Sequence, residues 1–173
     1  TGINFTTEGV VTPFEISEGI IVPTGTYNHE EAQIVFITNP SKPLYVSTRS
    51  ILGGSFGGTR YLNTGTLGLR VGDKFNSEYS LAVSDVNLPA GDFVATIFGA
   101  RITYSFRPRI NLQSFIQYNS EADLWSLNIR FNLLEQANTG LFVVYNDVYI
   151  GGDVSNRSFT VKYTHVFDLL HKK

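Results

Sequence analysis

The amino-acid sequence predicts an all-β protein, an antiparallel up-and-down transmembrane β-barrel of about 8–10 strands. Three observations support this prediction. Long segments alternate between apolar and polar residues, which is the period of a strand whose two faces meet different environments. Most of these segments are about 10–14 residues long, closer to the ~9–11 residues of a tilted membrane-spanning strand than to the ~5–6 of a typical globular strand. Turn residues separate the segments at short, regular intervals.

The alternation is clearest in two segments. In 123–133, one side carries Trp125, Leu127, Ile129, Phe131 and Leu133, and the other carries Leu124, Ser126, Asn128, Arg130 and Asn132. In 93–106, one side carries Val94, Thr96, Phe98, Ala100, Ile102, Tyr104 and Phe106, and the other carries Ala95, Ile97, Gly99, Arg101, Thr103 and Ser105. A series of such strands is what a transmembrane barrel needs.

The first 24 residues form a separate N-terminal unit in this prediction. A strand over 3–16 is followed by a proline-bent loop, because Pro13 and Pro23 would interrupt a central ladder. We expect this unit to be part of the barrel, or to pack in its lumen or at a rim.

The rest of the chain reads as consecutive strands joined mostly by hairpins. We expect them at 25–38, 43–56, 59–71, 77–88, 93–106, 109–118, 123–134, 140–150 and 158–167. With the N-terminal strand the total is nine or ten, and closure favours an even number. The barrel then covers 25–168, with a C-terminal tail over 169–173.

Composition excludes several classes of function. The formal net charge of −2 provides no basic field for nucleic acid. Cysteine is absent, which removes disulfides and thiolate metal sites, and we expect no metal and no cofactor. No run of 18 apolar residues exists, so a transmembrane helix is not predicted. The mean hydropathy near zero fits alternating lipid-facing and lumen-facing residues.

Basic residues lie in the middle of strands, at Arg49, Arg70, Arg101, Arg130 and Lys162. Arg or Lys on the lipid face near the midplane costs roughly 2–4 kcal/mol, so these five should point inward. The polar side chains expected to line the same lumen are Asn111, Gln113, Gln117 and Asn128. The lumen would then favour anions. Alternatively, the cations pair with Glu31, Asp85, Asp147 or turn carboxylates, and the barrel is filled by side chains.

Aromatic residues cluster near strand ends and recur on the apolar side. The aromatics expected to face lipid or its interfaces are Trp125, Phe98, Tyr104, Phe106, Phe131, Phe159, Tyr163 and Phe167. The last strand alternates Phe159, Val161, Tyr163, His165 and Phe167. This pattern resembles the C-terminal signal read by the outer-membrane insertion machinery, which is therefore an expected partner alongside outer-membrane lipid.

Several short segments, spread from Pro13 to Phe167, form a recognisable set. They lie at 13–16, 21–27, 53–58, 86–93, 114–120, 128–131, 141–146 and 161–164. Gln117-Tyr118-Asn119-Ser120 followed by 141–146 is the most specific part. The set resembles the C-terminal barrel domain of a Gram-negative outer-membrane family of uncharacterised function, whose members often carry an N-terminal domain similar to family-9 carbohydrate-binding modules. The resemblance implies a barrel larger than this chain, so that the chain is either a trimmed product or is completed by further strands or a partner chain, and it implies no catalytic residues.

The sequence thus predicts an integral protein of the bacterial outer membrane, a pore, passive transporter or membrane anchor with a polar, cation-weighted lumen. Two alternatives stay open. One is a barrel enzyme acting on lipid or glycan, with His29 or His165 in its site, although no G-x-S-x-G or H-E-x-x-H sequence occurs. The other is a soluble β-barrel or sandwich that binds an apolar ligand inside.

Overall fold

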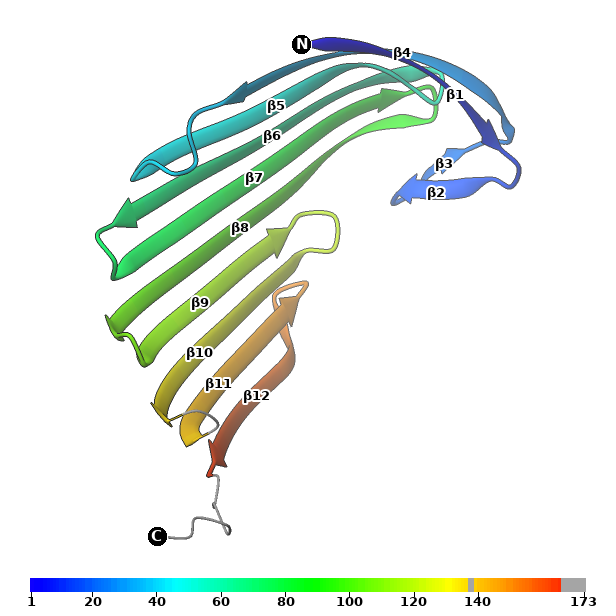
Figure 1. Cartoon of the computed structure of the whole chain (residues 1–173). Coiled ribbons are helices and arrows are strands. Elements are labelled where there is room, and N and C mark those ends of the chain that lie inside the picture. The colour runs from blue at the N-terminus through cyan, green and yellow to red at the C-terminus, as the bar shows by residue number, and fades with distance from the viewer. Residues whose placement is uncertain (137–138, 166–173) are drawn as a thin grey trace, which may run out of the picture.

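The protein is a single curved antiparallel sheet of ten strands with a short hairpin on one face (Figure 1). The computed structural model describes residues 1–136 and 139–165. The sheet contains β1 (Gly2–Val10), β4 (Gly25–Ile37), β5 (Leu44–Ser55), β6 (Gly58–Val71), β7 (Phe75–Leu88), β8 (Gly91–Arg107), β9 (Ile110–Asn119), β10 (Leu124–Gln136), β11 (Thr139–Ile150) and β12 (Asp153–Thr164). From β4 onward each strand pairs with the next one in sequence, so the predicted all-β, up-and-down fold is confirmed.

The predicted strands from 25–38 to 140–150 coincide with β4 to β11 to within two residues at either end. Two predictions differ from the structure. The strand expected over 3–16 ends at Val10, and residues 14–17 belong to the hairpin instead. The strand expected from 158 begins at Asp153, because a bulge beside Val148 and Tyr149 keeps the polar run before Phe159 in register with β11.

The ten-stranded sheet is open. Its order runs from β1 to β12, and within the described residues neither of these edge strands has a second partner. Figure 1 shows a trough whose concave side faces the hairpin. The described residues therefore form the curved wall of a barrel-like fold but do not close it.

The hairpin consists of β2 (Phe14–Ser17) and β3 (Ile20–Val22), which turn at Gly19 with φ +74. Ile20 and Val22 pack against Val86 and Leu88 to form the buried apolar cluster of the molecule. The Ser17 hydroxyl also donates a hydrogen bond of 2.8 Å to the Glu121 carboxylate in the β9–β10 turn. The proline-bent segment is thus a small sheet fixed across one end of the trough.

The register divides the side chains of the sheet into two faces. We call the face that meets the hairpin the inner face and the opposite one the outer face. The buried apolar residues of the described chain are Ile20, Val22, Ile51, Val86, Leu88 and Ala100. Such a small core leaves most large apolar side chains exposed, and on the sheet these lie chiefly on the outer face.

Candidate functional site

All the residues that were predicted to line a lumen lie on the inner face. Arg70, Asn76, Thr103, Gln113 and Arg130 are successive cross-strand partners from β6 to β10. The neighbouring row, from β8 to β10, is Arg101, Phe115 and Asn128. The register places Arg49, Lys162, Asn111 and Gln117 on the same face.

Asparagine side chains link neighbouring strands across the inner face. The Asn128 amide donates to Asn146, and the Asn146 amide donates to the Ser158 hydroxyl at 3.1 Å. The Asn132 amide donates to Asn111 at 2.7 Å. These bonds join β9 to β12, so this part of the inner face is a connected polar surface.

Among the described residues, no carboxylate forms an ion pair with any of the five predicted cations. The ion pairs among the described residues are His29–Glu8 at 3.7 Å, Arg60–Glu31 at 2.7 Å and Arg157–Asp147 at 2.8 Å. Arg49 instead donates to the Gln33 amide oxygen, and the Arg101 guanidinium lies 5.5 Å from the centre of the Phe115 ring. Glu31 and Asp147 thus pair with arginines that the sequence analysis left out.

Two polar cavities adjoin each other on the inner face. One, of about 400 Å³, is lined by Arg101, Thr103, Phe115, Asn128, Gln113 and Arg130. The other, of about 490 Å³, is lined by Asn111, Asn132, Phe142, Gln113 and Arg130. Because Gln113 and Arg130 belong to both, the cavities form one recess that contains two arginines and several amides.

The carboxylate nearest to this recess in register is turned away from it. Glu78 is the direct cross-strand partner of Arg101, yet it accepts a 2.6 Å hydrogen bond from the Tyr45 hydroxyl on the other side. The Tyr45 ring reaches Glu78 by lying over Gly68, where a Cβ atom would overlap the ring. Glycine at position 68 therefore permits the contact that keeps Glu78 from Arg101.

The outer face carries the aromatics predicted to meet lipid. The register places six of them there: Trp125, Phe131, Phe98, Tyr104, Phe159 and Tyr163. The ring of Phe106 packs edge-on against the ring of Tyr104, with ring centres 4.9 Å apart. Trp125 packs on Tyr118 with ring centres 4.6 Å apart, close to the β9–β10 turn. Phe167 and the tail over 169–173 lie outside the described residues.

An ionic cluster interrupts the apolar outer face at β11 and β12. Asp147 is only 5% exposed, and its Oδ2 accepts hydrogen bonds from Arg157, Tyr145 and Tyr149. The expectation that Asp147 and Asp85 neutralise interior cations is wrong, since the register places both on the outer face. Alternation contained the signal for Asp147, because it shares a parity with Tyr145 and Tyr149.

His29, a candidate for a hydrolytic site, lies in β4 as the predicted strand over 25–38 implies, and is 7% exposed between the rings of Tyr27 and Phe56. Neither of its ring nitrogens has a hydrogen-bond partner among the described residues, and Nε2 lies 3.7 Å from a carboxylate oxygen of Glu8. The described residues also contain no group of three or more histidine or acidic side chains able to hold a metal.

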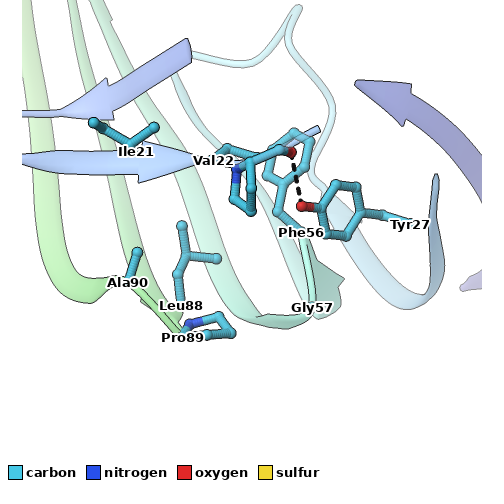
Figure 2. A pocket seen from close by; sticks show the side chains of 9 residues that line it. Ile21, Val22, Tyr27, Phe56, Gly57, Leu88, Pro89 and Ala90 are labelled. Carbon is cyan, nitrogen blue, oxygen red and sulfur yellow. Dashed lines mark hydrogen bonds between the residues drawn. The ribbon is translucent and has the colours of Figure 1, made fainter. Parts of the chain in front are cut away.

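An apolar pocket of about 380 Å³ lies where the hairpin meets the sheet (Figure 2). Val22 and Pro23 line it from the hairpin side, and Tyr27, Phe56 and Leu88 line it from the sheet. The Tyr27 hydroxyl donates a hydrogen bond of 2.9 Å to the Pro23 carbonyl, which closes one side. The pocket is thus the seam between the hairpin and the inner face.

Comparisons with protein-family models, with curated proteins and with solved structures returned no match. Among the residues that the structure describes, no helix is long and apolar enough to cross a membrane. The function therefore has to be argued from the two faces of the sheet.

Proposed function

We propose that the chain is an integral β-barrel protein of the bacterial outer membrane, acting as a pore, a passive transporter or a membrane anchor. One observation supports this above all: large apolar side chains lie exposed on the outer face from β1 to β12, with Phe5 76% and Phe159 67% exposed. Soluble monomers rarely expose contiguous apolar patches above a few hundred Å². Lipid contact would cover this surface.

In this proposal the inner face lines a polar lumen. Arg49, Arg70, Arg101, Arg130 and Lys162 would select solutes electrostatically as they pass, without covalent chemistry. The expected partners are outer-membrane lipid and the insertion machinery, and the open edges would pair with each other, with further strands or with a partner chain. A soluble barrel with an apolar interior fits poorly, because the inner face is the polar one outside the hairpin contact.

The test is purification in detergent, with comparison of boiled and unboiled gel mobility. We expect a detergent-bound species whose mobility changes on boiling, as for a closed membrane barrel. Conductance across a planar bilayer then separates a pore from an anchor, and a pore should prefer anions. A monomer that stays soluble without detergent and keeps its mobility would overturn the proposal.

A further inference from the structure

The recess between β8 and β11 has the composition of a specific binding site. It contains Arg101 and Arg130 on strands separated only by β9, with Gln113 of β9 between them. Both guanidinium groups are positively charged, so an anion bound in the cavity that they line would be attracted by both. No carboxylate among the described residues forms an ion pair with either arginine.

The orientation of Arg101 strengthens this argument. Its cross-strand partner Glu78 could neutralise it, but Glu78 is held by the Tyr45 hydroxyl. The guanidinium of Arg101 lies instead over the Phe115 ring, on the side of the recess. A guanidinium that lies over an aromatic ring can still present N–H donors at the edge of its own plane to a planar acceptor such as a carboxylate.

The other residues that line the recess indicate the chemistry of the rest of the ligand. The amides of Gln113, Asn111 and Asn132 and the Thr103 hydroxyl offer donors and acceptors on both sides of Arg130. Such groups suit hydroxyls of a ligand, which both donate and accept. The joined cavities of about 400 and 490 Å³ have the size of a small-molecule site.

We propose that this recess binds a small hydroxylated carboxylate, with Arg101 and Arg130 on the carboxylate and the amides on the hydroxyls. The inference deepens the proposed function, because it gives the polar inner face a solute class. The binding site itself requires only the folded sheet.

The test is calorimetric titration of the purified full chain in detergent micelles with gluconate, acetate and sorbitol. Sorbitol has the hydroxyls of gluconate without its carboxylate, and acetate has a carboxylate without hydroxyls. We expect gluconate to bind about tenfold or more tightly than either. Equal binding of sorbitol or acetate, or no binding of gluconate, would overturn the inference.

Variants locate the site. Arg101→Gln with Arg130→Gln should lower gluconate affinity by about tenfold or more, since each substitution removes a charged donor pair. Lys42→Gln with Lys74→Gln removes the same charge from the β4–β5 and β6–β7 turns, outside the recess, and should change affinity less than about twofold. An equal loss of gluconate affinity in both double variants would mean that the positive charges of the protein attract gluconate without a specific site.

Two further measurements keep the outcome interpretable. If the first pair fails to fold, alkylation of Thr103→Cys in the recess should be slowed by gluconate but not by sorbitol, and an unchanged rate contradicts the site. Gel mobility on the same samples tests the barrel independently. A soluble, unshifted chain that still binds gluconate would end the membrane proposal alone, whereas a shifted chain without binding would end only the inference.

Discussion

At the residue scale, Asp147 has the most demanding surroundings. Its carboxylate is nearly buried on the outer face, and one oxygen, Oδ1, has no hydrogen-bond partner among the described residues. The other oxygen, Oδ2, accepts hydrogen bonds from Nε and Nη2 of Arg157, at 3.1 and 2.8 Å. Arg157 is about half exposed, but removing it leaves the charge of the nearly buried Asp147 unpaired, which is costly, whereas removing both charges is often tolerated.

We therefore expect Arg157→Leu to lower the unfolding temperature in detergent by several degrees. The double variant Asp147→Leu with Arg157→Leu should recover most of that loss, because no uncompensated charge remains. Circular dichroism during heating measures both. If the double variant is no more stable than Arg157→Leu, the unpaired charge of Asp147 is not the cause of the lost stability.

Gly68 gives a second prediction at this scale. Alanine there would push the Tyr45 ring off its place and break the Tyr45–Glu78 hydrogen bond, at a cost of about 1–3 kcal/mol in the free energy of unfolding. Gly65 lies on the same strand with open space at its Cβ position, so Gly65→Ala is the matched control. Denaturant unfolding in micelles should separate the two variants. Similar midpoints would mean that Tyr45 moves aside freely.

At the scale of elements, the hairpin β2–β3 is attached to the sheet mainly through the apolar side chains of Ile20 and Val22. Val22 is 1% exposed and Ile21, its neighbour, is 55% exposed. Val22→Ala should weaken hairpin docking by about 2 kcal/mol, and Ile21→Ala should have little effect. Proteolysis at the Glu18–Gly19 turn reports docking: faster cleavage in Val22→Ala alone is expected, and equal rates in both would contradict the role of the cluster.

The strands were predictable because alternation fixes both their extent and their faces. It placed Arg101 and Arg130 on one side and Trp125 and Phe131 on the other before any register was known. The hairpin was not predictable in the same way, since its proline-flanked segments are too short to show a period. The start of β12 was missed because the polar residues before Phe159 look like a turn, and only pairing with β11 makes them strand.

At the scale of the whole molecule, few apolar side chains among the described residues are buried. Val86 and Leu88 belong to the cluster under the hairpin, and Ile51 and Ala100 are isolated from it. The sequence predicted this distribution of apolar residues, because it alternates throughout. It could not predict closure, which depends on whether the strands at the two edges can meet.

Closure is the final prediction, and it follows from the backbone. In lipid, each unpaired N–H or C=O of an edge strand costs several kcal/mol, so β1 and β12 must find partners there. Every neighbouring pair in the ten-stranded sheet is antiparallel, which makes β1 antiparallel to β12. The two edges therefore have the right directions to pair with each other, and we expect the chain to close on itself in the membrane.

The absence of cysteine makes this closure measurable. Thr6→Cys in β1 is combined in turn with Ser158→Cys, Thr160→Cys and Lys162→Cys in β12, all on the inner face. One combination should form a disulfide within the chain, because bridged Cα atoms lie about 4.4–6.8 Å apart and the stagger of the two edges selects one partner. Thr7→Cys, on the outer face, replaces Thr6→Cys in the control and should form no disulfide with the same β12 cysteines. Disulfide-linked dimers would mean that a second copy completes the barrel, and failure of every combination would mean that other strands lie between the edges.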